Sequence, residues 1–268
     1  MRIVVTLVKD ILFAITPMKN RFLFLLISAC FSVFLSCSSS HGIIRYEDTF
    51  LSVDSLLAPD STITADIAPY KVQYSKIMDD VLAVSEQVMM KDNPEGLLGN
   101  FTADIILNKA NELCKDSCSV DICLLNNGGL RNPLPKGNIT RGNVFQLMPF
   151  ENEIVILQLN GNAVKEMLDF LANKGGMPIA GMRMKIKNNM AADATIGGKP
   201  FDISKSYTVV TSDYLANGGD NMTFFANAIR KITIGKLLRN AIIEYLQEES
   251  EKGNTIKVKK DGRIEKVE

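Results

Sequence analysis

The sequence predicts an α+β fold, a mixed α/β sheet with flanking helices, because strand-like and helix-like stretches mix without a regular β-α-β alternation. Residues 120–125 form an apolar run, interrupted only by Asp121, which indicates a short buried strand. Residues 180–186 alternate between apolar and charged side chains, which indicates a strand with one exposed face. Residues 98–113 place their apolar side chains on one side of a helix, as in Phe101, Ile105, Ile106 and Ala110.

The other elements follow from the same periodicities and from turn residues. We expect further helices over residues 70–82, 140–147, 162–171 and 234–246, with Thr140 and Thr233 as N-caps of the second and last. We expect further strands over residues 43–46, 84–90, 154–159 and 207–210, and a turn at Asn160-Gly161. A closing hairpin is expected in which residues 255–259 and 263–264 flank the turn at Asp261-Gly262.

The composition is that of an ordinary globular protein, with 46% hydrophobic and 22% charged residues. Lys+Arg and Asp+Glu both number 30, so no basic excess suggests a nucleic-acid partner. The one histidine, His41, lies in a serine-rich stretch. Hydrolytic metal centres and His-based triads need imidazoles inside a folded site, so the composition argues against both. Catalysis with metals held only by Cys and Asp is the remaining alternative.

The first 37 residues have the pattern of a secretory signal, with Met18 as the alternative start. Lys19 and Arg21 precede an apolar run over residues 22–35, and Ser36-Cys37-Ser38 follows it. Cys37 resembles a bacterial lipoprotein acceptor, so we expect an exported protein, periplasmic or anchored to the outer membrane by a lipid. Two alternatives are lipidation at Cys30 and an ordinary cleaved signal. Residues 38–66 are then a lead-in, and residues 67–268 form the folded domain.

Three further cysteines leave two interpretations open. Cys114 and Cys118 are four residues apart, and they could form a disulfide if the helix ends near residue 116. With Cys123, three thiols cannot all pair within the chain, and buried free thiols are the alternative. A metal site is not expected, because no histidine accompanies them.

The loop over residues 126–131, Asn-Asn-Gly-Gly-Leu-Arg, follows the buried strand. Asn and Gly tolerate positive φ, and a glycine-rich loop lets a ligand approach backbone N–H groups. Arg131 adds a planar donor fork suited to phosphate or carboxylate. A second such loop, residues 211–220, follows the strand at 207–210. Each loop alone is also compatible with an ordinary turn.

Taken in order, residues 126–131, 148–152 and 214–220 resemble the C-terminal, substrate-binding domain of bacterial and animal 5′-nucleotidases. The resemblance runs from about Tyr70 to the end of the chain. Residues 94–100 resemble the entry to the first helix of that domain, and residues 261–264 resemble its closing strand. The resemblance therefore implies a 5′-nucleotidase C-terminal-domain-like fold that binds a nucleotide or nucleoside.

The resemblance also implies roles for seven residues. Phe150 and Tyr214 would sandwich the nucleobase, and Asp220 would bind the ribose hydroxyls. Asn126 would lie near the sugar and base, and Asn152 would contact the base edge. Arg131 would face the ribose and phosphate, and Gly181 would allow a close backbone approach. Without the resemblance, Phe150 could be a core residue, Tyr214 an anchor at a helix start and Asp220 a turn residue.

Two positions depart from the family pattern. Pro94 stands where the family commonly carries a substrate-binding Arg, and Asn127 replaces a frequent Gly. The family's metallophosphatase domain carries His-containing metal motifs, and the sequence, with its one histidine, contains none of them. We therefore expect no cofactor in this chain and no phosphatase activity of the chain alone. The expected role is the nucleotide-binding half of a split nucleotide-hydrolysing system in nucleotide catabolism, with divalent metals on a separately encoded metallophosphatase. The alternative is an exported surface-binding module that no longer handles nucleotides.

Overall fold

A computed structural model describes residue 54 and residues 57–114 and 118–267. The chain divides into two compact units, residues 1–58 and 59–268, and the helices and strands described belong to the second. The expected strand at 43–46, the signal segment, His41 and both candidate lipidation cysteines lie outside the described residues. Of the helices within the described ranges, none combines the length and apolar character that crossing a membrane requires.

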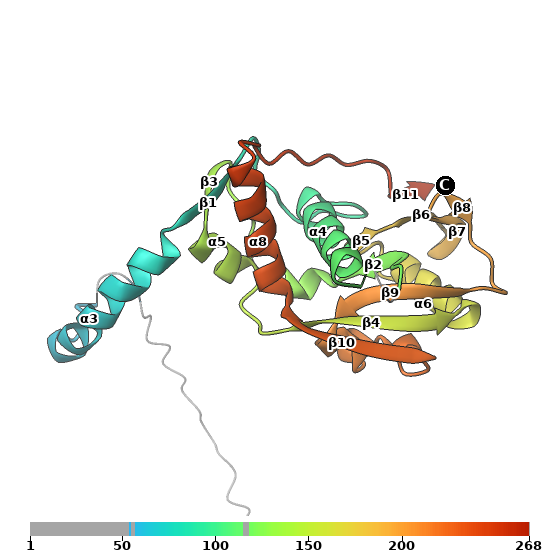
Figure 1. The fold of residues 1–268 in the computed structure, drawn as a ribbon, viewed down its shortest axis with the longest axis horizontal. Helices are drawn as coiled ribbons and strands as arrows, with labels where there is room; N and C mark the ends of the chain where they lie inside the picture. The colour runs from blue at the N-terminus through green and yellow to red at the C-terminus, as the bar shows by residue number, and fades with distance from the viewer. Residues whose placement is uncertain (1–53, 55–56, 115–117, 268) are drawn as a thin grey trace, which may run out of the picture. The chain divides into compact units, whose positions relative to one another are not determined.

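A five-stranded mixed sheet forms the centre of the domain (Figure 1). Only β9 and β2 run parallel to each other, and the other neighbours are antiparallel, which confirms the predicted mixed sheet. The strand order is β10 (Arg230–Leu237), β4 (Glu153–Asn160), β9 (Ser206–Ser212), β2 (Ile122–Leu124) and β5 (Ile179–Ala180).

Both faces of this sheet are covered, so successive residues of its central strands enter different cores. Cys123, Ile156 and Val210 pack with residues of α4 (Leu97–Cys114) and α8 (Leu238–Glu251). Leu124 and Leu157 pack with α6 (Gly161–Asn173). The expectation of a short buried strand within residues 120–125 is confirmed, and the apolar side chains of the helices at 98–113 and 162–171 are buried as expected.

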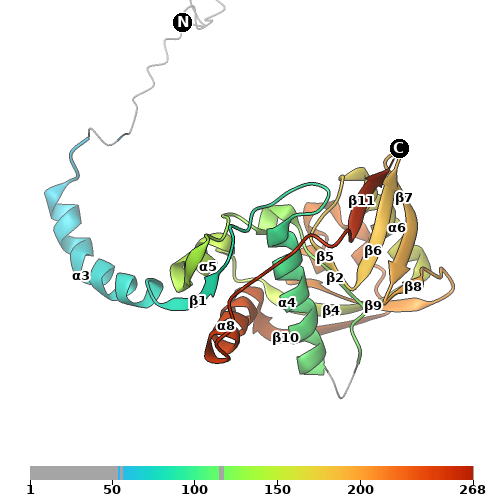
Figure 2. The same ribbon diagram turned by 90° about the horizontal axis from the view of Figure 1, so that it is seen from above.

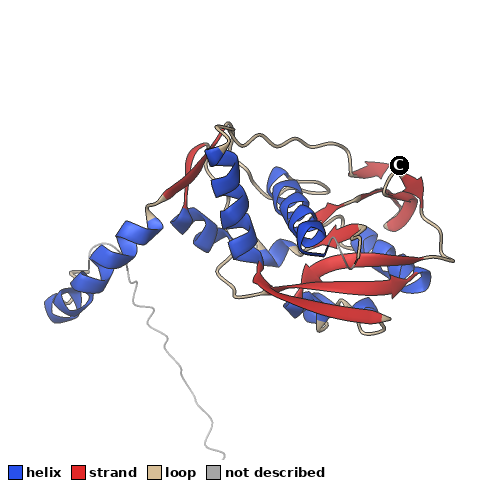
Figure 3. Cartoon of the chain, in the orientation of Figure 1, coloured by secondary structure: helices blue, strands red, loops and turns tan. Residues whose placement is uncertain are grey.

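Two smaller sheets flank the central one (Figures 2 and 3). In the first, β6 has buried Met and Ile residues alternating with exposed or half-exposed basic ones, which confirms the predicted half-exposed strand. Its strand order is β11 (Ile264–Val267), β6 (Met182–Lys187), β7 (Met190–Ile196) and β8 (Lys199–Pro200). In the second, β1 (Val81–Ser85) pairs with β3 (Gly137–Thr140). The strands β3, β7 and β8 were not expected from the sequence.

The predicted closing hairpin is wrong. Strand β11 pairs with β6, in parallel, and Ile256 forms a bridge with Ser85 of β1. The two halves of the expected hairpin thus pair with distant partners. A Gly at a positive φ, Gly262, makes the bend at residues 261–262, but hydrogen bonds from elsewhere decide where the chain goes next.

The first described helix begins earlier than predicted. Helix α3 (Ser61–Met78) contains Pro69, and the expected strand at 84–90 is instead β1, at residues 81–85. The carboxylate of Asp60 accepts from the backbone N–H groups of Thr62 and Ile63 at 2.8 and 3.0 Å. This N-cap satisfies N–H donors that a helix start leaves free. It places the start of the helix about two turns ahead of Pro69.

The helix predicted over residues 234–246 is also wrong at its start. Strand β10 continues to Leu237, with Thr233 opposite Val155 of β4, and α8 begins at Leu238. The stretch contains Ile232 and Ile234, β-branched residues that favour an edge strand. By contrast, Thr140 caps α5 (Arg141–Leu147) as predicted, in a reciprocal capping box. The expected turn at Asn160-Gly161 is the start of α6, with Asn160 as its N-cap.

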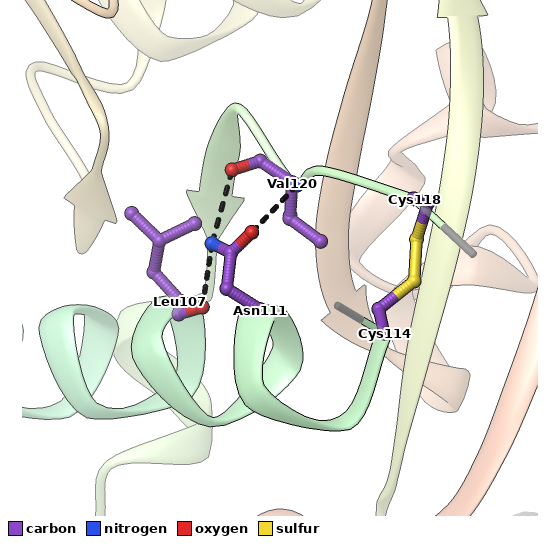
Figure 4. Close-up of a disulfide and its surroundings, with 5 residues drawn as sticks. All are labelled: Leu107, Asn111, Cys114, Cys118 and Val120. Carbon is purple, nitrogen blue, oxygen red and sulfur yellow. Dashed lines mark hydrogen bonds between the residues drawn. A yellow bond between two sulfur atoms is a disulfide. The ribbon is translucent and has the colours of Figure 1, made fainter. Parts of the chain in front are cut away.

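Two of the three thiols pair. Cys114, the last residue of α4, forms a disulfide with Cys118, with 5.4 Å between their Cα atoms (Figure 4). The amide of Asn111 fastens the same corner, because it donates to the carbonyl of Val120 at 3.2 Å and accepts from its N–H at 2.8 Å (Figure 4). Cys123 is free and buried, and burial raises the pKa of its thiol well above the ordinary value.

Candidate functional site

Three loops meet at one end of the strands of the central sheet, where β2 and β9 end and β4 begins, and we call this end the sheet edge. Strands β2 and β9 are parallel, with Cys123 beside Val210, so the loops that follow them leave at the same edge. Strand β4 is antiparallel to β9, with Ile154 opposite Ser212, so the loop that precedes β4 reaches this edge as well. Ligands commonly bind beyond the carboxyl ends of parallel strands in mixed sheets. The three stretches that carried the sequence resemblance therefore belong to one surface.

The sheet edge carries a hydrogen-bonded triad. Asn126, buried at the end of β2, donates from its amide to the Asp220 carboxylate at 2.6 Å. The Tyr214 hydroxyl donates to the other oxygen of Asp220 at 2.8 Å. Tyr214 lies in α7 (Asp213–Ala216) and Asp220 in the short 3-10 turn η2 (Gly219–Asn221). Side chains from two separate loops are thus held in fixed positions before any ligand binds.

Asp220 has the geometry of an anchored acceptor. Its φ of 54° is in the left-handed region, which Asp tolerates better than most residues. An ionised carboxylate offers about four lone-pair sites, and the two hydrogen bonds of the triad leave roughly half of them for other donors. Hydrogen bonding to Asp220 raises the pKa of Tyr214, which keeps the phenol a donor over the neutral range.

The ring of Tyr214 rests on a glycine. A Cβ placed on Gly219 would lie 2.5 Å from the ring carbon Cε1, so any larger residue would displace the ring. This close approach gives a physical reason for the Gly-Gly-Asp sequence at residues 218–220.

The loop over residues 148–152, which we call the Phe150 loop, is held from below by Arg239 of α8. The guanidinium donates to the carbonyls of Met148 and Phe150 at 3.4 and 3.3 Å. It also lies over the Phe145 ring, 4.2 Å from the centroid, and is within 3.7 Å of a Glu151 oxygen. Arg239 is 6% exposed, and its Nε has no partner among the described residues. Sequence reasoning missed this residue, because nothing in the helix pattern distinguishes it.

The two aromatic side chains assigned to the nucleobase project into solvent. Phe150 is 40% exposed and Tyr214 47% exposed, although large apolar residues at this edge of the sheet are otherwise mostly buried. Asn152 is half-buried in the Phe150 loop, and its backbone carbonyl accepts from the N–H of Leu238 at 2.9 Å. Exposed rings on fixed loops can stack on a flat ligand without first leaving a core.

Two positively charged side chains lie on the loop over residues 126–131, which includes the 3-10 turn η1 (Asn127–Gly129). Arg131 donates to the carbonyl of Gly128, and Lys91 donates to the carbonyl of Asn127, each at 3.4 Å. The sequence analysis identified Arg131 but missed Lys91, which precedes Pro94 by three residues. Its proximity depends on long-range pairing, since Met89 and Leu134 form the bridge that brings its segment here.

Gly181 does not join this cluster. Strand β5 is antiparallel to β2, so Gly181 follows β5 at the end of β2 opposite to Asn126. Its φ is +77°, and a Cβ there would lie 2.0 Å from the carbonyl oxygen of Asp121. The close backbone approach expected at Gly181 is therefore to the protein's own chain.

The stretches at residues 94–100 and 261–264 contact each other away from the triad. The buried Glu95 carboxylate accepts from the N–H groups of Asp261 and Gly262 at 2.7 and 2.9 Å. Arg263 in turn pairs with Asp104 at 2.7 Å. These residues fix the return of the chain toward β11, and among the described residues no hydrogen bond joins them to the triad. Within the described ranges, no group of three or more His, Cys, Asp or Glu side chains could hold a metal ion.

Comparison with known proteins identifies the family of this domain. The family model for the 5′-nucleotidase C-terminal domain matches residues 75–227, which is more than half of the chain. The chain therefore belongs to the 5′-nucleotidase C-terminal domain family.

Individual relatives are longer than this chain. The trifunctional nucleotide phosphoesterase protein YfkN of Bacillus subtilis is 29% identical over 75% of this chain and 14% of its own length. The 5′-nucleotidase precursor of Thermus thermophilus has a TM-score of 0.66 at 26% identity, over 78% of this chain and 44% of its own. The NAD nucleotidase of Haemophilus influenzae shares the fold, with a TM-score of 0.58 at 18% identity, over 77% and 41%. The chain thus spans less than half of each of these relatives.

Proposed function

We propose that this domain binds a nucleotide or nucleoside at the sheet edge formed by the Phe150 loop, Tyr214 and the Asn126–Asp220 pair. The observation that carries the proposal is the convergence of these three loops. They bring two exposed aromatic rings and an anchored carboxylate to one surface. The relatives are named as a nucleotide phosphoesterase and a 5′-nucleotidase precursor, and these names support the same ligand class.

Each group has a chemical task in this proposal. Phe150 and Tyr214 stack on the two faces of the base, and such stacking contributes about 1–3 kcal/mol per base while tolerating different bases. Asp220 accepts from the ribose hydroxyls, and Asn126 holds that carboxylate in place while presenting its own amide to the sugar and base. Asn152 contacts the base edge. Arg131 and Lys91 provide positive charge for a phosphate group.

We further propose that the domain is the substrate-binding half of a split nucleotide-hydrolysing system in nucleotide catabolism. Two metal ions activate water and stabilise the transferred phosphoryl group in many hydrolases of phosphate esters. The single histidine and the lack of a metal-ligating cluster in the described part of the chain favour a metal centre on a separately encoded metallophosphatase. Divalent metals would then be cofactors of that partner.

Calorimetric titration with adenosine and AMP tests the aromatic pair. Phe150→Ala and Tyr214→Ala should each weaken adenosine binding about fivefold to a hundredfold, the range that corresponds to loss of one stacking interaction. Tyr70→Ala is the matched control, because Tyr70 is exposed and lies in α3. Unchanged affinity in both loop variants would contradict the stacking assignment.

A second titration tests the carboxylate. Asp220→Asn should weaken adenosine binding but leave the weaker binding of 2′,3′-dideoxyadenosine unchanged, because that ligand lacks the ribose hydroxyls. Asp193→Asn is the control, since Asp193 has a similar φ of 49° on an exposed hairpin. Equal effects of Asp220→Asn on both ligands would show that the carboxylate does not recognise the ribose.

One observation favours a different function, an exported surface-binding module that no longer handles nucleotides. Pro94 stands at the position where the family resemblance places a substrate-binding Arg. Under this alternative the wild-type protein binds neither adenosine, AMP nor a nucleotide-sugar. Under the main proposal at least adenosine or AMP binds.

The cellular location is also a proposal. We propose export and anchoring by lipidation of Cys37, supported by the positive, apolar and serine-flanked pattern of the first 40 residues. Mass spectrometry of the mature N-terminus discriminates this from lipidation at Cys30 and from cleavage without a lipid, and Cys37→Ser should abolish the lipid-modified form.

A further inference from the structure

Helix α3 has an apolar face that is exposed in the described part of the structure. Residues 63, 67, 70, 74 and 77 recur at alternating spacings of four and three, so they fall on one side of the helix. We call this set the α3 stripe. Each member is between 53% and 74% exposed, and α3 has no buried residue among its 18. The stripe consists of Ile63, Ile67, Tyr70, Tyr74 and Ile77.

The stripe ends in a groove between three helices. Ile77 of α3, Phe145 of α5 and Ile243 of α8 line this groove together with polar side chains, among them Arg141 and Asp80, which form an ion pair. Together the stripe and groove form a contiguous surface. Monomeric soluble proteins rarely expose contiguous apolar patches larger than a few hundred Å², and larger patches with a polar rim mark interaction sites.

We propose that the α3 stripe and this groove form the docking surface for the metal-bearing phosphatase of the split system, an inference that rests on the proposed function. The family match begins at residue 75, in the last turn of α3, and the matched family is by name a C-terminal domain. The Thermus relative is longer than this chain, which covers 44% of it, and a domain named C-terminal is one that other parts of a protein precede. Helix α3 is the element at that border.

The groove is also connected to the proposed nucleoside site. Phe145 lines the groove on one side and contacts the Arg239 guanidinium on the other. The same guanidinium donates to the carbonyl of Phe150 at 3.3 Å. Two side chains in contact, Phe145 and Arg239, thus connect a body seated in the groove to the Phe150 loop. A phosphatase must come close to that loop to hydrolyse a nucleotide held there, which a partner of unrelated function need not do.

Pairing of α3 with a second copy fits less well. Sustained coiled coils need roughly three to four heptads, whereas the 18 residues of α3 hold between two and three. Pro69 removes a backbone hydrogen bond from the middle of the helix. Tyr70 and Tyr74 would bring two hydroxyls per chain into the dimer core, where each needs a partner.

The test uses the full chain as bait in a detergent extract of its source cells. The variant Ile67→Glu/Tyr74→Glu charges the stripe. Val72→Glu is the matched control, because Val72 is 72% exposed and lies on the opposite face of the same helix. The readout is AMP hydrolysis that co-purifies with the bait and is abolished by EDTA, with mass spectrometry to identify the captured protein by its metal-ligand motifs.

We expect the wild-type chain and Val72→Glu to capture this activity, and the stripe variant to capture at least about tenfold less, as for loss of a central interface residue. Three results overturn the proposal: no captured phosphatase, equal capture by all three chains, or self-association of the purified wild-type chain that the stripe variant abolishes in sedimentation velocity. Calorimetry with adenosine on the same three chains is independent of docking. Binding of adenosine there with no capture refutes the docking surface alone, whereas a wild-type chain that binds neither adenosine nor AMP refutes the proposed function.

Discussion

Arg239 provides the sharpest test of how the fold positions the site. It is buried in α8 and donates to two carbonyls of the Phe150 loop, at 3.4 and 3.3 Å. Among the described residues, no hydrogen bond joins it to Asn126, Tyr214 or Asp220. Arg239→Met keeps much of the side-chain volume and removes the donors and the charge. We expect two effects, on stability and on nucleoside affinity.

The size of each effect follows from the contacts. A buried carbonyl left without a donor costs about 1–3 kcal/mol, and the cation–π contact with Phe145 contributes roughly 0.5–2 kcal/mol. Because both hydrogen bonds are long, the lower ends apply, and we expect a loss of about 2 kcal/mol in the free energy of unfolding. The loss in adenosine affinity cannot exceed what Phe150 itself contributes, about 1–3 kcal/mol.

A double-mutant cycle separates positioning from general destabilisation. Calorimetry on Arg239→Met, Phe150→Ala and the double variant should give non-additive losses, because Arg239 acts through Phe150. Leu246→Ala is the control: it removes a fully buried side chain of the same helix, and we expect it to lower stability by about 2–5 kcal/mol without weakening adenosine binding. Additive losses, or a control that weakens binding as much as Arg239→Met, would refute the reasoning.

Three further predictions concern single groups. Lys91→Met should weaken AMP binding about twofold to fivefold and leave adenosine binding unchanged in calorimetry, as for one exposed ion pair; equal losses for both ligands would contradict a phosphate contact. Gly181→Ala should lower the urea midpoint far more than Gly197→Ala, because both have positive φ but only Gly181 meets backbone within 4 Å; similar midpoints would be evidence against the close contact. Asp220→Asn should lower the pKa of Tyr214 in an absorbance titration, because the raised value depends chiefly on the hydrogen bond to that carboxylate. In the wild type this raised pKa stabilises the fold below about pH 10, and the contribution disappears as pH rises through the folded-state value; an unchanged titration in the variant would refute the coupling.

The sequence by itself determined the elements whose local signals agree. The run at 120–125 was identified correctly, and so was the alternation predicted over 180–186 from Met182 onward, because burial on both faces and burial on one face leave different periods in the sequence. Ala180, which the same prediction included, belongs to β5 of the central sheet instead. Thr140 was identified as a cap because capping is a contact within one turn. The ordered loops also placed Asn126, Phe150, Tyr214 and Asp220 in one family pattern.

Other features depended on strand order and long-range packing, which no local period contains. Antiparallel pairing of β5 with β2 separated Gly181 from Asn126, although a glycine-rich pattern surrounds both. Lys91 and Arg239 reached the site through bridges and helix packing, so nothing near them in sequence announced a role.

The errors in element boundaries have the same origin. The stretch 230–237 offered both an edge strand and a helix start, and pairing with β4 selected the strand. Residues 255–264 had the turn of a hairpin, but β6 provided a better partner for β11 than the preceding segment did. Sequence determines what a segment can form and which side chains it must bury. The tertiary structure decides which strand ends meet, because that choice depends on partners far away in the chain.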